Sequence, residues 1–69
     1  MITSDPELQA SQERIAYFHR VLAQLRVTSR PDLFPSMASG YRAEIVRMQR
    51  EVLDYLTRHA SEPVTAEAG

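Results

Sequence analysis

The 69-residue chain contains no cysteine, no tryptophan, no lysine and no asparagine. Without cysteine it has no disulfide framework, no thiolate metal site and no cysteine nucleophile. The chain is too short for a dinucleotide-binding unit with a substrate domain or for a TIM barrel, so it forms one small domain at most. A single internal glycine, Gly40, cannot form a phosphate-binding loop.

The sequence also lacks long apolar runs and a strong charge of either sign. No segment approaches the roughly 20 apolar residues of a membrane span, and the first residues are not basic, so we expect a cytoplasmic protein with no membrane contact. Eight arginines against nine acidic residues leave a formal net charge of -1, which argues against a strongly basic nucleic-acid clamp. That every cation is arginine reflects either codon bias or recognition of phosphates or carboxylates.

Two segments with helical periodicity occupy most of the chain. The first helix is predicted over residues 5–26, after an N-terminal lead of residues 1–4. Ser4 and Glu7 have the spacing of a capping box, or alternatively Asp5 is the cap. Apolar residues then recur at steps of three, four and seven, which places them on one side of a helix: Leu8, Ile15, Phe18, Leu22 and Leu25.

A turn is predicted over residues 27–35, because this stretch contains two prolines. The residue before a proline is shifted toward extended geometry, so Arg30 and Phe34 are expected outside any helix. Leu33 and Phe34 are too apolar for a fully solvated loop. We interpret them as a cover over the end of the core, or alternatively as a short docking motif.

The second helix is predicted over residues 36–60, although Gly40 weakens its first turn and leaves a start at Tyr41 as an alternative. Its apolar positions again follow helical steps: Tyr41, Ile45, Met48, Val52, Tyr55 and Leu56. Opposite charges lie four residues apart on its outer side and predict three ion pairs: Arg47–Glu51, Arg50–Asp54 and Asp54–Arg58. Residues 61–69 have no periodicity, and we expect a disordered tail.

The short turn allows the two helices to form an antiparallel hairpin, so the expected fold is all-α. With the turn centred near Pro31, Phe18 falls opposite Ile45 and Leu22 opposite Tyr41. Steps close to 3.5 residues are typical of coiled-coil packing. The apolar arc of the second helix spans roughly half of its circumference, which is wider than one partner helix covers.

A chain of this size seldom gains enough stability from its own core, and it has no disulfide or evident metal to compensate. We therefore predict a homodimer in which two hairpins form a four-helix bundle. The competing interpretation is that the hairpin docks on a different, larger protein. The predicted oligomer core consists of Leu8, Ile15, Phe18, Leu22, Leu25, Tyr41, Ile45, Met48, Val52, Tyr55 and Leu56. The predicted contacts with a second subunit or a partner are Tyr17, Val21, Arg42, Val46, Gln49 and Leu53.

Two of these predicted contacts, Arg42 and Gln49, are polar residues inside the apolar arc. An unpaired polar group is costly in an apolar interface. The two residues mark the edge of an interface and set its register, or they are simply exposed at the edge of the bundle, or they contact a ligand. The sequence leaves these three interpretations open.

No constellation of residues predicts catalysis or metal binding. In the predicted hairpin His19 and His59 lie about 24 Å apart along the axis, too far to share a metal within one chain. A metal site shared across a dimer interface is the alternative. No carboxylate lies within either apolar stripe, and no serine lies in a Gly-x-Ser-x-Gly elbow. We expect a non-enzymatic protein without catalytic residues, metal or cofactor.

The predicted function is a protein–protein interaction module that acts as a small homo-oligomeric adaptor or regulator. The alternative is a small dimeric RNA- or DNA-binding regulator, in which an aromatic ring stacks on a base while neighbouring arginines contact phosphates. The residues of that exposed helix side are Arg14, Tyr17, Arg20 and Gln24. Glu13 lies among them and weakens the positive field, so nucleic acid is the less favoured partner.

Overall fold

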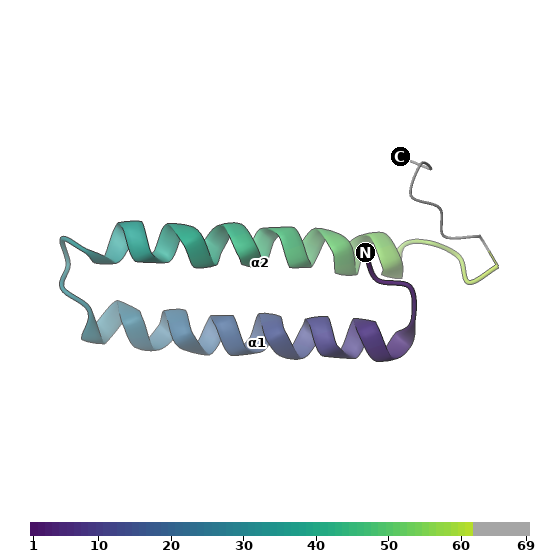
Figure 1. The fold of residues 1–69 in the computed structure, drawn as a ribbon, viewed down its shortest axis with the longest axis horizontal. Coiled ribbons are helices and arrows are strands. Elements are labelled where there is room, and N and C mark those ends of the chain that lie inside the picture. The colour runs from purple at the N-terminus through teal and green to yellow at the C-terminus, as the bar shows by residue number, and fades with distance from the viewer. Residues whose placement is uncertain (62–69) are drawn as a thin grey trace.

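The computed structural model describes residues 1–61, and every regular element within them is helical. Helix α1 runs over Asp5–Thr28 and helix α2 over Phe34–Leu56. The two helices lie side by side in opposite directions and are joined at one end by residues 29–33 (Figure 1). The predicted all-α hairpin is therefore confirmed. From residue 62 onward, the predicted tail lies outside the described residues.

The start of α1 follows the predicted spacing of Ser4 and Glu7. The Ser4 hydroxyl accepts a hydrogen bond from the Glu7 backbone N–H at 3.4 Å, and Pro6 lies in the first turn, where its missing N–H costs nothing. The Glu7 carboxylate accepts in turn from the Thr3 backbone N–H at 3.3 Å and from the Ser4 hydroxyl at 3.0 Å. Hydrogen bonds from the Thr3 and Ser4 hydroxyls hold the pKa of Glu7 below its ordinary value.

Helix α1 continues two residues beyond its predicted end at Arg26. The Thr28 hydroxyl donates to the Gln24 carbonyl at 3.0 Å. The Ser29 N–H donates to the Leu25 carbonyl at 2.9 Å. The Ser29 bond satisfies one of the last four carbonyl groups, which have no partner within the helix, and the Thr28 hydroxyl adds a second bond to the last turn.

The prediction that Phe34 lies outside any helix, with the second helix starting at Ser36, is wrong. Helix α2 begins at Phe34, with Pro35 in its first turn. The preceding turn directs the chain into the helix, because the N–H groups of Leu33 and Phe34 both donate to the Arg30 carbonyl at 3.0 Å. Contact between the proline ring and the preceding residue disfavours helical geometry there, but the turn hydrogen bonds to the Arg30 carbonyl hold Phe34 in it. The missing Pro35 N–H costs nothing, because it lies in the first turn.

The remainder of α2 also differs from the expectation. The helix passes through Gly40 without interruption, so the alternative start at Tyr41 is not used. It ends at Leu56, four residues before the predicted end. Thr57 caps this end: its N–H donates to the Leu53 carbonyl at 2.9 Å, and its hydroxyl donates to the same carbonyl at 2.6 Å.

Three buried side chains of α2 form the centre of the interface between the helices: Ile45, Met48 and Val52. The half-buried side chains around them are Leu8, Ile15, Phe18, Leu22 and Leu25 of α1 and Tyr41 and Tyr55 of α2. The rings of Phe18 and Tyr41 meet edge to face with centroids 5.6 Å apart. This contact lies one turn nearer the connection than the predicted pairing of Phe18 with Ile45. Leu56, which we placed with this core, is exposed, because α1 begins opposite Tyr55 and does not extend over it.

The first four residues are part of the fold, which the sequence did not predict. They turn back from the start of α1 toward α2 (Figure 1). Ile2 is only 5% exposed, and it borders a hollow that Ser11 of α1 and Met48 of α2 also line. The side chain of Ile2 therefore closes one side of the interface at the end of the hairpin where the chain begins.

Candidate protein-interaction surface

One side of α2 presents apolar side chains that α1 does not cover. Five positions recur there at steps of four and three residues, so they share one side of the helix beside the buried stripe. Leu53 is 58% exposed and Leu56 is 55% exposed, and Val46 is exposed as well. We call this surface the open face; its residues are Arg42, Val46, Gln49, Leu53 and Leu56.

Toward the connection, the open face leads into a groove of about 650 Å³ between the two helices. Ala23 of α1 and Ala38 of α2 line it, and their small side chains leave space between the helices. Arg26 and Arg42 line it as well, and within residues 1–61 neither forms an ion pair. Phe34, which we expected as a cover over the core, is half-buried in this lining. The result is a mostly apolar hollow with two free cations.

The two polar residues of the open face, Arg42 and Gln49, are exposed in the hairpin. Neither side chain forms a hydrogen bond within the part of the chain that the structure describes. They are therefore free to contact whatever lies over the open face, which agrees with a position at the edge of an interface.

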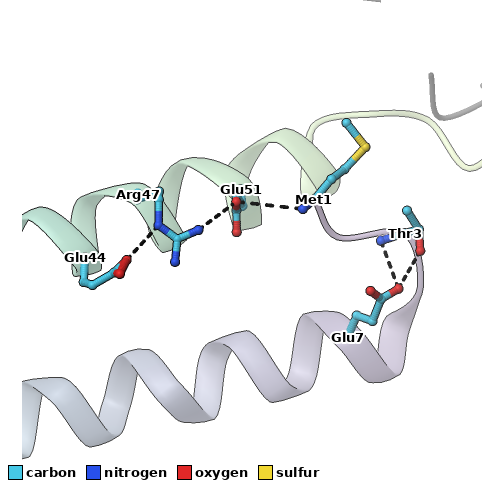
Figure 2. Close-up of polar contacts among 6 residues, drawn as sticks. All are labelled: Met1, Thr3, Glu7, Glu44, Arg47 and Glu51. Atoms are coloured by element: carbon cyan, nitrogen blue, oxygen red, sulfur yellow. Dashed lines mark hydrogen bonds and ion pairs between the residues drawn. The ribbon is translucent and has the colours of Figure 1, made fainter. Parts of the chain in front are cut away.

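The opposite side of α2 carries a line of ion pairs (Figure 2). Arg47 lies between two carboxylates, 2.7 Å from Glu44 and 3.1 Å from Glu51. The Glu51 carboxylate also lies 3.9 Å from the amino nitrogen of Met1. The hydrogen bond to Glu44 and the charges of both carboxylates raise the pKa of Arg47. Of the three predicted ion pairs, only Arg47–Glu51 is formed within the described residues.

These charged side chains are at least partly exposed, so each pair contributes little to stability. Their position is informative, because the N-terminal segment meets them on the side where Met48 is only 3% exposed. We call this side the covered face; its residues are Ile2, Glu44, Arg47, Met48 and Glu51.

A further polar contact joins the two helices beside the termini. The Tyr55 hydroxyl donates to the Asp5 carboxylate at 2.6 Å, across 50 residues of sequence. This hydrogen bond raises the pKa of Tyr55, since it stabilises the protonated phenol, and partial burial and the nearby negative charge act in the same direction. The contact fixes the start of α1 against the end of α2.

Tyr17 and Val21, which we predicted as partner contacts, do not belong to the open face. Both are two positions from His19, which lines the groove. Residues two apart on a helix point in nearly opposite directions, so Tyr17 and Val21 lie on the far side of α1. The predicted partner contacts therefore divide between two surfaces.

The residues predicted to bind nucleic acid, Arg14, Tyr17, Arg20 and Gln24, are all exposed, but they do not share one surface. Tyr17 lies on that far side, whereas Arg14 lines the hollow beside Ile2 and Met48. The Tyr17 ring already has two neighbours: the Arg20 guanidinium lies 5.9 Å from its centroid, and the Phe18 ring centroid is also 5.9 Å away. A base that stacks on Tyr17 would therefore compete with contacts inside the chain.

The two histidines lie in different parts of the hairpin. His19 lines the groove, whereas His59 follows α2 and its Nδ1 lies 2.7 Å from the Ser61 hydroxyl oxygen. Within residues 1–61, no group of three histidine, aspartate or glutamate side chains is arranged to hold a metal ion. The described residues therefore offer no candidate metal centre to compare with the open face.

Comparisons with models of protein families, with curated proteins and with solved structures found no match. Neither of the two described helices combines the length and the apolar character needed to cross a membrane. The candidate site is accordingly defined by the exposure and charge of the open face and its groove.

Proposed function

We propose that the chain is a non-enzymatic helical protein–protein interaction module, a small homo-oligomeric adaptor or regulator. In this proposal two hairpins pack through their open faces into a four-helix bundle. The observation that carries it is the row of exposed Val46, Leu53 and Leu56 beside the buried stripe of the same helix. A contiguous exposed apolar surface of this kind is typical of interaction sites.

The small core supports the same proposal. Among the described residues only four side chains are buried, and none is completely enclosed. Stable domains ordinarily enclose their core between two packed layers of secondary structure, whereas this hairpin has a single layer of two helices. A second copy supplies the missing layer.

Solution mass and far-UV circular dichroism across a dilution series test the proposal. We expect a helical dimer whose helicity falls on dilution, because association and folding are linked by mass action. A folded monomer at all concentrations contradicts the proposal. A chain that stays largely unfolded at all concentrations also contradicts it and assigns the open face to a different protein.

Two matched variants locate the interface. Leu53→Ala and Tyr17→Ala each shorten a side chain that is more than half exposed, but only Leu53 lies on the open face. We expect Leu53→Ala to raise the dimer dissociation constant about tenfold and Tyr17→Ala to leave it unchanged. The reverse result places the interface on the far side of α1.

The alternative function, a small RNA- or DNA-binding regulator, is favoured by one observation, an aromatic ring on the surface, Tyr17, with the exposed Arg20 stacked on it. We rank it second because that stack already occupies the ring. Heparin chromatography and mixed RNA in a mobility-shift assay test it. Binding that weakens steeply with salt and is lost in Arg20→Gln supports this alternative, because phosphate contacts release counterions.

A further inference from the structure

We propose that the groove receives Leu53 and Leu56 of a second copy, so that the two hairpins lie in opposite directions. This inference rests on the proposed function and specifies the geometry of the same interface. It places the connection of each hairpin over the terminal end of the other.

The open face has a projection at one end and a hollow at the other. The two exposed leucines project near the C-terminal end of α2, and the groove opens beside Arg42 near its N-terminal end. Arg42 and Leu53 are eleven residues apart, about 17 Å along the helix. A two-fold axis across the open face between Val46 and Gln49 exchanges these ends. Each groove then faces the leucines of the other copy, and the contact closes on itself.

The available surface is large enough for such a pair. Helix α1 has 24 residues and α2 has 23, so each is about 36 Å long, and two adjacent helices are about 20 Å wide. One side of the hairpin therefore presents about 700 Å². Stable protein–protein interfaces bury about 800 Å² on each partner, which is close to this value.

The charge distribution favours opposite directions. Residues 19–44, around the connection, carry four arginines against two carboxylates, a formal charge of +2. The other described residues, 1–18 and 45–61, carry four arginines against five carboxylates, a formal side-chain charge of -1. Hairpins that point the same way would bring Arg26 and Arg42 of both copies together, whereas opposed hairpins place these cations over the end of the partner at which carboxylates outnumber arginines.

A charge exchange at two positions tests the arrangement. In opposed hairpins, Leu53→Arg removes the leucine and sets an arginine against Arg42 of the second copy at both ends of the dimer. We expect it to raise the dimer dissociation constant about a hundredfold, well beyond the effect of Leu53→Ala. The double variant Arg42→Glu/Leu53→Arg converts both repulsive contacts into ion pairs. We expect its dissociation constant to return to about that of Leu53→Ala, because the ion pairs remove the repulsion but do not replace the leucine in the groove. Because residues 42 and 53 are too far apart to meet within one helix, any recovery comes from contacts between copies.

Two control variants make the same kinds of charge change at positions outside the open face. Leu33→Arg adds the same charge at an exposed leucine in the connection, and Arg50→Glu reverses an exposed arginine on the outer side of α2. We expect both to associate as the unaltered protein does. Circular dichroism at high concentration checks that Leu53→Arg, a change at an exposed position, keeps the helices.

A distance measurement tests the inference without changing the interface. The sequence has no cysteine, so Asp32→Cys carries a single nitroxide label at the connection. Opposed hairpins place the two labels about 45 Å apart, since each connection is about 15 residues from the two-fold axis. Hairpins that point the same way place them within about 20 Å, given the width of two packed helices.

The outcomes separate this inference from the proposed function. A dimer with distant labels and a recovered double variant supports both. A dimer with close labels, or a double variant as weak as Leu53→Arg alone, overturns the opposed arrangement and leaves self-association intact. A folded monomer at every concentration overturns both, and the groove is then assigned to an acidic amphipathic helix of another protein.

Discussion

The covered face and the open face lie on two sides of α2 and differ in how far their apolar side chains are exposed to solvent. On the covered face, Ile2 is 5% exposed and lies in the lining that includes Met48, and the Arg47 ion pairs border it. On the open face, Leu53 is 58% exposed, and nothing within the described residues lies over it. Both sides carry large apolar side chains. The difference teaches that burial in this hairpin depends on a short neighbouring segment of chain, more than on the hydrophobicity of α2 itself.

The largest effect is expected at Ile45, which lies in the helix interface that both faces share. Ile45→Asp places an unpaired charge at a buried position and should lower the free energy of unfolding by at least about 3 kcal/mol. Circular dichroism with urea measures the loss. Ala43→Asp, two residues away on the exposed side of the helix, is the control and should keep the helices. Normal helicity and mass for Ile45→Asp would show that the helix interface is wrongly placed.

Shortening Ile2 tests whether the covered face supports the fold. Ile2→Ala removes a buried side chain and should lower the free energy of unfolding by about 2 kcal/mol in urea denaturation. Leu33→Ala changes a side chain that is about half exposed, and a cost below about 0.5 kcal/mol is expected. An equal loss in free energy of unfolding for the two variants would mean that the N-terminal segment does not protect the helix interface. It would contradict the distinction between the covered and the open face.

Gly40 allows backbone preference to be separated from side-chain cover. It lies inside α2 with ordinary negative φ, and a Cβ built there meets nothing within 4 Å. Gly40→Ala should therefore raise the free energy of unfolding by about 0.5–1 kcal/mol. The reverse change at an exposed site of the same helix, Ala43→Gly, should lower it by a similar amount. A destabilised Gly40→Ala protein would reveal a close neighbour at this site, such as a second copy.

The smallest effect is expected from the contact between Tyr55 and Asp5 at the end with the termini. The pKa of Tyr55 is raised in the folded chain, so its contribution is complete below the pKa of an unfolded tyrosine and is lost as pH rises through the folded value. Absorbance titration should show a component above the ordinary tyrosine range that disappears in Tyr55→Phe. Asp5→Asn should move this component back toward the ordinary range, and an unchanged titration would refute the contact.

The sequence predicted the features that depend on local periodicity. The spacing of apolar residues predicted the two helices, and the short segment between them predicted the hairpin. The spacing of Ser4 and Glu7 predicted the start of α1. Helix ends were less accurate, because the hydrogen bonds of the Thr28 and Thr57 hydroxyls and of the Ser29 N–H at those ends follow no periodic pattern in the sequence. Phe34 was misplaced because the turn hydrogen bonds to the Arg30 carbonyl, which outweigh the preference against helix before proline, leave no pattern in the sequence.

The candidate site was predicted only in part. Arg42, Val46, Gln49 and Leu53 could be grouped from their spacing on one helix, and the structure places them on one surface. The groove and the role of Ile2 could not be predicted, since both depend on how segments distant in sequence meet. Ile2 is a single apolar residue before a helix, so no periodic pattern marks it as buried. Ala23 and Ala38 lie on two different helices, and their small side chains indicate a hollow only once the alignment of the helices is known.

The small number of buried side chains also determines how the protein responds to heat. The enthalpy and the heat capacity of unfolding grow with the surface that unfolding exposes. An isolated hairpin that buries only four side chains over residues 1–61 should therefore melt gradually, over a wide range of temperature. A dimer whose unfolding exposes the helix interfaces and the paired open faces together should melt in a sharper transition. Thermal melting curves that steepen as protein concentration rises would show that cooperative unfolding is a property of the assembly.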